Sequence, residues 1–345
     1  MTYISELPGG ELLHARGGAQ EALHARAANA AYKYFGRQVF LRAVVEVSNY
    51  CRENCAYCGM RRDNRNLSRF RARHDELAEL LVNQRPQSVT DVNIQAGEDP
   101  VVVREVVIPL IKTLRRETRL GVSVCLGSLD PKLYSELKSA GATIYIIKFE
   151  IADPTLYRLM NAPGTHKERI AQIHHLAANG WRVSSGFIAG LPGMTDEQLL
   201  ENFALARALP LAGCSVSPFI PGDETPLANK PVGDIDLTLN CMAALRLMQP
   251  HWVIPAVSAL NIAEPGMGYR RGLRTGANLV TINLTPSEFR GDYLLYKRDR
   301  FIMTEERILN SIAAEGLATS TTSLSEFYQL RGDGSARSQA AAVVA

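Results

Sequence analysis

LRAVVEVSNYCRENCAYC, residues 41–58, joins two patterns that together decide the fold. It opens with an apolar, β-branched run that is typical of a buried strand. Directly after this run, Cys51, Cys55 and Cys58 lie within eight residues and make up half of the six cysteines in the chain. A strand followed at once by such a loop predicts a parallel α/β fold with its chemistry at the carboxyl end of the strand.

Seven further strand-like runs follow, and segments of helical period lie between them. This alternation predicts a complete (β/α)8 TIM barrel. An open, doubly wound sheet is the alternative, but helical segments between all eight strands favour closure. The expected strands are residues 41–47, 89–95, 121–125, 143–149, 183–189, 214–219, 252–257 and 278–283.

The barrel is expected to occupy residues 37–331 of the 345-residue chain. Residues 1–36 are rich in alanine and lack strand alternation, which predicts an N-terminal helical extension. Residues 332–345 are rich in Gly, Ser and Ala, which predicts a short, disordered C-terminal tail. The expected organisation is therefore one catalytic barrel with a short segment at each end.

Composition and charge argue against several classes of protein. The net charge of +3, from 38 basic and 35 acidic residues, is too small to indicate a nucleic-acid partner. No apolar run reaches the roughly 18 residues of a membrane helix, and the start of the chain lacks a signal-peptide pattern. We therefore expect a cytoplasmic protein with no membrane or nucleic-acid partner, whose clustered cysteines serve metal or redox chemistry rather than disulfides.

The three clustered cysteines leave one metal position open. Their spacing suits a cubane iron-sulfur cluster, because one loop can fold three thiolates onto three of its irons. The fourth iron then stays free for a substrate or cofactor, as in catalytic metal sites generally. Zinc is the alternative, but it needs a fourth ligand, and the nearest histidine, His74, lies well beyond the loop.

The CxxxCxxC spacing, with Tyr57 before the last cysteine and a strand before the first, resembles the radical S-adenosylmethionine (SAM) superfamily. The resemblance implies a [4Fe-4S] cluster on Cys51, Cys55 and Cys58, with Tyr57 beside the cofactor. The open iron of such a cluster binds SAM and cleaves it reductively to methionine and a 5′-deoxyadenosyl radical. The resemblance also implies a small-molecule substrate and a one-electron reductant such as flavodoxin or ferredoxin.

Further positions resemble the SAM-binding elements of the superfamily. In QAGEDP, Gly97 and Glu98 match the element that receives the methionine amino group. The resemblance implies that Arg169, in THKERI, binds the SAM carboxylate, for which a guanidinium fork is well suited. It also implies that Ile188, in SSGFIAGLPGMT, lies against the adenine.

Lys148 and Glu150, in KFEIADP, lie two residues apart on an expected strand and therefore face the same way. The resemblance implies that Glu150 contacts the sugar or amino group of SAM. Lys148 stands where an arginine is expected. In the alternative interpretation, the two side chains form a structural ion pair inside the barrel.

Within the superfamily, the chain resembles the biotin synthase group, and in it the branch of the [FeFe]-hydrogenase maturase HydE and 3-methylornithine synthase. The segments that carry this resemblance are CGMRRDN, QAGEDP, PFIPGDETPLAN, GANLVTINLTP and YLLY. Biotin synthases hold a second, sulfur-donating cluster, but here Gln95, Ala96 and Ser184 stand where its further cysteines would be expected, and Cys125 alone cannot hold it. Sulfur insertion is therefore disfavoured.

The upper ends of the later strands supply candidates for substrate binding. Cys125 lies near the end of the third expected strand. Its side chain is equally expected to pack in the core or to line the cavity. Cys214 and Cys241 are expected to be core residues, since a free buried cysteine packs as a small hydrophobe. The remaining substrate candidates are Ser258, Thr281, Tyr293 and Tyr296.

The basic run RRDNRNLSRFRAR follows the cysteine loop. A solvated loop and helix start is the simpler interpretation. In the functional one, Arg61 or Arg62 helps a carboxylate-bearing substrate or an electron donor to dock.

The sequence therefore predicts a HydE-like radical SAM enzyme acting on a small amino-acid-like or organometallic substrate. Three alternatives remain: a carbon-skeleton mutase of the 3-methylornithine synthase type, sulfur insertion of the lipoyl or biotin type, and a non-catalytic iron-sulfur carrier. A carrier needs no SAM pocket, so the matches at Gly97, Glu98, Glu150 and Arg169 argue against it.

Overall fold

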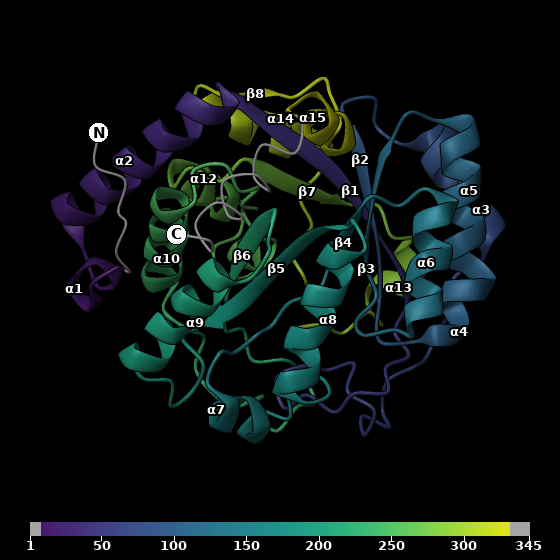
Figure 1. Cartoon of the computed structure of the whole chain (residues 1–345), viewed down its shortest axis with the longest axis horizontal. Coiled ribbons are helices and arrows are strands. Elements are labelled where there is room, and N and C mark those ends of the chain that lie inside the picture. The colour runs from purple at the N-terminus through teal and green to yellow at the C-terminus, as the bar shows by residue number, and fades with distance from the viewer. Residues whose placement is uncertain (1–7, 332–345) are drawn as a thin grey trace.

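A curved parallel sheet forms the centre of the molecule in the computed structural model, which describes residues 8–331 (Figure 1). Seven strands follow one another in the order β6-β5-β4-β3-β2-β1-β7, and every pairing between them is parallel. A short eighth strand pairs with the start of β1, outside this order. The strands are β1 (Gln38–Ser48), β2 (Asp91–Ala96), β3 (Gly121–Cys125), β4 (Ile144–Ile146), β5 (Arg182–Ala189), β6 (Gly213–Pro218), β7 (Leu279–Asn283) and β8 (Ala318–Thr319).

The parallel α/β class expected from the sequence is confirmed, while two of the expected strands differ in extent. Residues 252–257 were expected to form a full strand, but they make only single-residue bridges, from Val253 to Gly213 of β6 and from Pro255 to Leu279 of β7. Pro255 has no amide proton to donate, so a regular ladder cannot run through it. The fourth strand is also shorter than expected and ends at Ile146.

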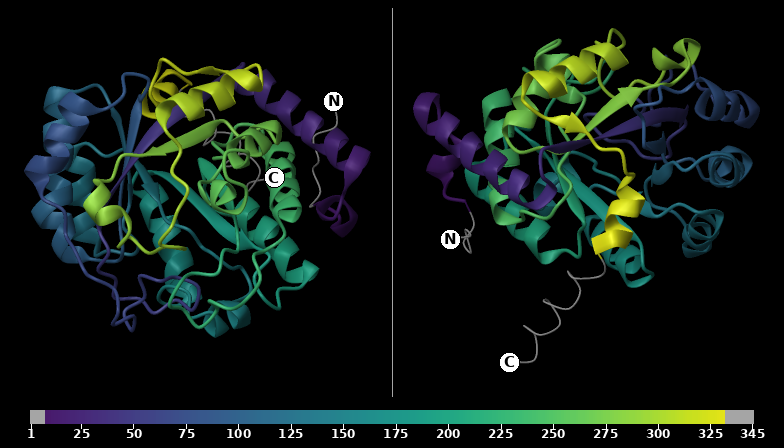
Figure 2. Two further views of the ribbon diagram at one scale, coloured as in Figure 1. Left: turned by 180° about the vertical axis from the view of Figure 1, so that it is seen from behind. Right: turned by 90° about the horizontal axis from the view of Figure 1, so that it is seen from above.

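Helices cover the outer face of the sheet (Figures 1 and 2). Many begin at an Asp or Thr whose side chain accepts a hydrogen bond from the first turn, as at Asp130, Asp153, Thr165, Thr195 and Thr304. The helices are α1 (Gly10–Leu13), α2 (Gly17–Phe35), α3 (His74–Glu79), α4 (Pro100–Val102), α5 (Ile108–Glu117), α6 (Pro131–Ala140), α7 (Pro154–Leu159), α8 (His166–Ala178), α9 (Asp196–Ala208), α10 (Ile235–Met248), α11 (Ala259–Ala263), α12 (Gly268–Arg274), α13 (Ser287–Arg290), α14 (Glu305–Ala314) and α15 (Leu324–Arg331), with π-helical turns η1 (Leu80–Gln84) and η2 (Val103–Val107).

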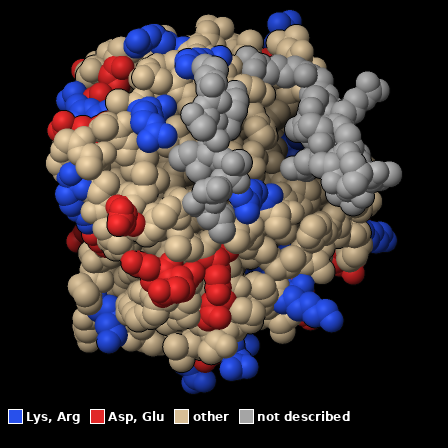
Figure 3. Space-filling view, turned by 60° about the vertical axis from the view of Figure 1, so that its left-hand side comes forward, with Lys and Arg blue, Asp and Glu red and all other residues tan. Residues whose placement is uncertain are grey.

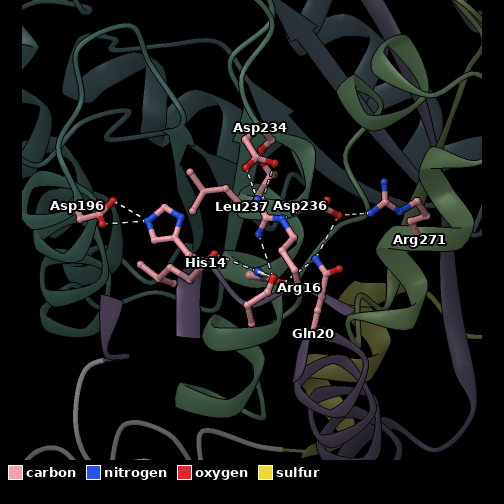
Figure 4. Close-up of polar contacts among 12 residues, drawn as sticks. His14, Arg16, Gln20, Asp196, Asp234, Asp236, Leu237 and Arg271 are labelled. Carbon is pink, nitrogen blue, oxygen red and sulfur yellow. Dashed lines mark hydrogen bonds and ion pairs between the residues drawn. The ribbon is translucent and has the colours of Figure 1, made fainter. Parts of the chain in front are cut away.

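The helical segment before β1 is held against α10 by apolar and polar contacts. Leu23 and Ala27 of α2 pack on Ala243. The buried Asn240 donates to the backbone oxygens of Leu13 and Ala15 at 3.0 and 2.9 Å. Figure 4 shows the polar contacts around this junction, in which His14 meets Asp196 and Arg16 meets Asp234.

The helix α15 lies at the amino ends of β2 and β3. The backbone N–H of Leu324 donates to both carboxylate oxygens of the buried Asp91, at 3.0 and 3.1 Å. Burial raises the pKa of Asp91 to about 6. The tail expected at residues 332–345 lies outside the described residues.

Figure 3 shows one face of the molecule, on which basic side chains are scattered and several acidic ones gather in one patch. Among the helices of the described part of the chain, none is long and apolar enough to cross a membrane.

Candidate active site

A cavity of about 360 Å³ lies inside the curved sheet and reaches the loops at the carboxyl ends of the strands. Its wall contains all the residues that the sequence indicated for the cluster, the cofactor and the substrate. These are the cysteines Cys51, Cys55 and Cys58, the expected cofactor residues Tyr57, Gly97, Glu98, Lys148, Glu150, Arg169 and Ile188, and the expected substrate residues Cys125, Ser258, Thr281, Tyr293 and Tyr296.

The loop after β1 carries the three cysteines, of which Cys55 is buried and the other two are half-buried. The backbone N–H of Glu98, at the end of β2, donates to the Cys51 sulfur at 3.4 Å. Burial raises the pKa of Cys58 to about 12 and that of Cys55 well above its ordinary value. Buried thiols of this kind need a cation to become thiolates, and a bound iron centre provides one.

The same loop is braced by arginines of the basic run. Arg69 donates to four backbone oxygens, those of Asn49, Met60, Arg61 and Asn64, at 2.6 to 3.2 Å. Arg71 pairs with the buried Asp99, which also accepts a hydrogen bond from Ser48 at 2.7 Å. Part of the basic run therefore holds the cysteine loop rather than meeting solvent.

The zinc alternative finds no support in the described residues, where no three His, Cys, Asp or Glu side chains are placed to hold one metal ion. An iron-sulfur cubane makes a different demand, because each cysteine binds a separate iron. The chemistry of the donor set, three thiols of one loop lining one cavity, fits such a cluster.

Two glycines allow close packing around the end of β2, Gly97 against the cysteine loop and Gly127 against the Glu98 side chain. A Cβ atom on Gly97 would lie 2.2 Å from the backbone oxygen of Tyr50 and 2.8 Å from Cβ of Cys51. Gly127 has a φ of +71°, and a Cβ there would lie 2.0 Å from Cγ of Glu98. Only glycine fits at these two positions without moving the loop or the Glu98 side chain.

Glu98 and Arg169 form a buried ion pair, with Nη2 of Arg169 2.8 Å from Oε1 of Glu98. The backbone N–H of Ser128 donates to the same Glu98 oxygen at 2.9 Å. Nε of Arg169 is buried and has no hydrogen-bond partner in the described residues. The pair therefore keeps a free donor at the cavity wall, which suits an anionic group on a ligand.

Lys148 and Glu150 also form an ion pair, at 3.0 Å, as the structural alternative anticipated. The sequence placed both residues on one face of a strand, and this prediction is wrong, because both residues follow the end of β4. Glu150 has a φ of +64°, a left-handed conformation that is uncommon for residues other than glycine. Its backbone is held by β5, since its N–H donates to Gly186 and its oxygen accepts from Ile188, each at 3.0 Å.

The cavity wall contains a third ion pair that the sequence did not predict. Arg300 donates to both carboxylate oxygens of Glu46, at 2.9 and 3.0 Å. The Glu46 side chain is buried, and that of Arg300 is 9% exposed. The signal for Glu46 was available, because Arg42, Val44 and Glu46 alternate on one face of β1 and two of them are charged. Arg300 comes from the irregular segment after α13, where no local pattern marks it.

The cysteines outside the loop do not assemble a second site. Cys214 and Cys241 are fully buried in the hydrophobic core, as expected. Cys125 is half-buried and lines the cavity, and burial raises its pKa to about 11. The described residues therefore offer no set of cysteines for a second cluster beside Cys125.

A curved parallel sheet with a three-cysteine loop at the carboxyl end of its first strand, facing a cavity inside the sheet, is the arrangement of radical SAM enzymes. The model of the radical SAM superfamily matches residues 45–206. The [FeFe] hydrogenase maturase subunit HydE of Thermotoga maritima is 36% identical over 279 residues, which are 81% of this chain and 80% of that protein. The chain belongs to the radical SAM superfamily and is an enzyme.

Two further comparisons agree with this assignment. A 3-methylornithine synthase of Methanosarcina acetivorans is 26% identical over 289 residues, covering 82% of this chain and 81% of that protein. The crystal structure of the methylornithine synthase PylB superposes with a TM-score of 0.80 at 22% identity, covering 92% of this chain and 95% of that chain. At this level of identity, the similarity to PylB shows a shared fold and nothing more.

Proposed function

We propose that this enzyme is HydE-like and uses a [4Fe-4S] cluster, held by Cys51, Cys55 and Cys58, to cleave SAM reductively during hydrogenase maturation. The observation that carries the proposal is that one cavity brings these cysteines together with the Glu98–Arg169 and Lys148–Glu150 ion pairs. The identity to the HydE maturase over four-fifths of both chains supports the choice among radical SAM reactions.

The chain's own residues would position SAM around the cysteine loop. The backbone at Gly97 and the Glu98 carboxylate would receive the methionine ammonium, and Arg169 would use its free Nε for the carboxylate. Glu150 would accept from the ribose or the amino group, with Lys148 beside it. Tyr57 and Ile188, both at the cavity wall, would pack against the cofactor, Ile188 against the adenine.

The bound cluster and SAM would together supply a 5′-deoxyadenosyl radical, and the protein's part is to orient the substrate and exclude water. The cavity, of about 360 Å³, suits a small amino-acid-like or organometallic substrate. Cys125, Ser258, Thr281, Tyr293 and Tyr296 would contact it. A one-electron reductant such as flavodoxin or ferredoxin would serve the cluster.

We also propose that the sheet acts as a complete eight-membered barrel. The bridges at Val253 and Pro255 support this, because they lie between the two edge strands β6 and β7. Four backbone hydrogen bonds of 2.9 to 3.2 Å accompany these bridges. Two of them join residues 252–257 to β6 or the residue before it, and the other two join this segment to β7 or the residue before it. Closure here would keep water out of the cavity from the side.

A mutase of the 3-methylornithine synthase type is the second candidate, favoured by the likeness to such enzymes over four-fifths of the chain. It needs the same cluster and SAM residues with a different substrate. Sulfur insertion of the lipoyl or biotin type would need a second cluster, for which only Cys125 faces the cavity. A non-catalytic iron-sulfur carrier would not need the two ion pairs beside the cysteine loop.

The proposal is tested by anaerobic reconstitution with iron and sulfide, addition of dithionite and SAM, and assay of 5′-deoxyadenosine. Cys51→Ala, Cys55→Ala and Cys58→Ala should each abolish cleavage, while the matched variant Cys125→Ala should keep the iron content and SAM cleavage of the parent. A parent that binds one full cluster and leaves SAM intact would support the carrier instead. An iron content near twice that of one cubane would revive sulfur insertion.

A further inference from the structure

The outer surface beside the cysteine loop carries a group of exposed basic side chains. Arg52 and Arg62 come from the loop and the residues after it, Arg158 from α7 and Lys167 from the first turn of α8. All four line a second hollow, of about 450 Å³, whose wall contains a single acidic residue, Glu53. We call these four residues the basic rim.

Much of the charge of the basic rim is free to meet a partner. Arg158 and Lys167 make no ion pair within the part of the chain that the structure describes. Among the described residues, Arg62 pairs only with its neighbour Asp63, in an exposed contact of 3.2 Å that is weak in water. Arg52 is directed partly inward, to Glu98 at 3.2 Å.

The one acid in this hollow does not cancel the charge at the surface. A carboxylate oxygen of Glu53 accepts the backbone N–H of Gly164 at 2.9 Å, and the other lies 3.7 Å from Arg52. Glu53 therefore connects the loop between Cys51 and Cys55 to the residues before α8. The net charge of the side chains that face outward from this hollow remains positive.

An apolar side chain lies next to the basic rim and connects directly to the cysteine loop. Leu159, the residue after Arg158, is 69% exposed. The next residue, Met160, accepts a hydrogen bond through its backbone oxygen from the N–H of Ala56 at 2.9 Å. Ala56 follows Cys55, so the exposed surface and the cysteine ligands are joined by a few bonds.

We propose that the basic rim and Leu159 form the docking site of a small acidic protein that delivers single electrons to the cluster. A basic surface around one exposed apolar side chain fits a transient partner, because complementary charge steers the encounter and a small apolar contact holds it briefly. One electron passes from the reduced donor to the cluster, and no bond is made or broken. This inference rests on the proposed function, since it needs a cluster in the loop.

The site lies outside the substrate cavity, and this separation allows a clean test. Arg158 and Lys167 line the second hollow and are not among the residues that line the substrate cavity, so their charge can be reversed without changing the proposed SAM site. The double variant Arg158→Glu/Lys167→Glu is the test protein. Lys112→Glu is the matched control, because Lys112 is exposed on α5, which lies well away from α7 (Figure 1).

Stopped-flow reduction of the reconstituted cluster would be followed with two donors, a reduced flavodoxin of net negative charge and reduced methyl viologen, a small cation. With flavodoxin at low salt, the double variant should be reduced about tenfold or more slowly than the parent and lose most of the salt dependence. Lys112→Glu should stay within about twofold of the parent. With the viologen, the double variant should be no slower than the parent.

An unchanged flavodoxin rate in the double variant would overturn the inference, as would an equal loss in the Lys112→Glu control. An equal loss with both donors would also overturn it, because the damage would then lie at the cluster. Binding of RNA to the basic rim, at a salt concentration at which flavodoxin does not bind it, would assign this surface to a different partner. Failure of the parent to bind iron would instead refute the proposed function, which the iron assay reveals separately.

Discussion

Arg169 of α8 lies 2.8 Å from Glu98 at the end of β2, and both side chains are buried. Burial works against the charged form of Arg169, but the Glu98 carboxylate and Tyr157 together more than offset it, so the net pKa of Arg169 is raised. The two residues are 71 positions apart in the chain. Their contact means that the two groups proposed for the ammonium and the carboxylate of SAM hold each other in place before any ligand arrives.

Removal of one partner of this pair should destabilise the protein strongly. Arg169→Met leaves the Glu98 carboxylate buried without its main counter-charge, and we expect the free energy of unfolding to fall by about 3 to 5 kcal/mol. The double variant Glu98→Gln/Arg169→Met should recover part of this loss, yet remain defective in SAM binding. Denaturant unfolding and calorimetric SAM titration measure the two effects separately. Equal stability of Arg169→Met and the parent would contradict the inferred cost.

Replacement of Gly97 by alanine should damage the cysteine loop. The new Cβ would lie 2.2 Å from the Tyr50 oxygen, so either the loop or the end of β2 has to move. We expect Gly97→Ala to bind markedly less iron after reconstitution than the parent. The matched control is Gly18→Ala, at a site in α2 where nothing lies within 4 Å of the added atom. That variant should be neutral or slightly stabilising, and a normal iron content in Gly97→Ala would refute the prediction.

The segment between α13 and α14 should loosen when its buried anchor is removed. Arg300 holds this segment to Glu46 inside the cavity, whereas Arg298 makes exposed ion pairs with Glu224 and Asp292. Arg300→Ala should therefore raise amide hydrogen exchange in residues 291–303 by an order of magnitude or more, and Arg298→Ala by much less.

Exchange would be read by mass spectrometry on the reconstituted protein, with iron content as the check that the cysteine loop is intact. Similar exchange in the two variants would show that the buried pair does not anchor the segment.

The sequence predicted the parallel strands and the residues around the cavity because both depend on local patterns. A β-branched run such as that of β1 is recognisable by itself, and loops at the carboxyl ends of parallel strands meet at one edge of a sheet. The sequence could not predict which of these residues touch. The contact between Glu46 and Arg300 joins positions 254 apart, and nothing near Arg300 marks it.

Two errors have local physical causes. Residues 252–257 have the composition of a strand, but Pro255 removes a donor, and the segment forms bridges only. Residues 147–149 continue the apolar pattern of β4, yet the chain leaves the strand at Ile146 and turns through the left-handed conformation at Glu150. Strand patterns indicate which residues are buried, and they do not show where the backbone departs from the ladder.

The buried Asp91 should make stability depend on pH in a direction opposite to that of most paired carboxylates. Burial raises its pKa to about 6 in the folded protein, above its ordinary value of 3.8. The folded state therefore binds a proton more tightly than the unfolded state does. The stability that Asp91 contributes is fully present below about pH 4 and is lost as the pH rises through about 6, by at most about 3 kcal/mol.

Asp91→Asn removes the titrating group and keeps an oxygen for the Leu324 N–H, so the melting temperature of this variant should depend less on pH between about 4 and 6. The comparison uses differences between proteins at each pH, because other groups titrate in the same range. An Asp91→Asn profile parallel to that of the parent would show that this carboxyl is not protonated on folding.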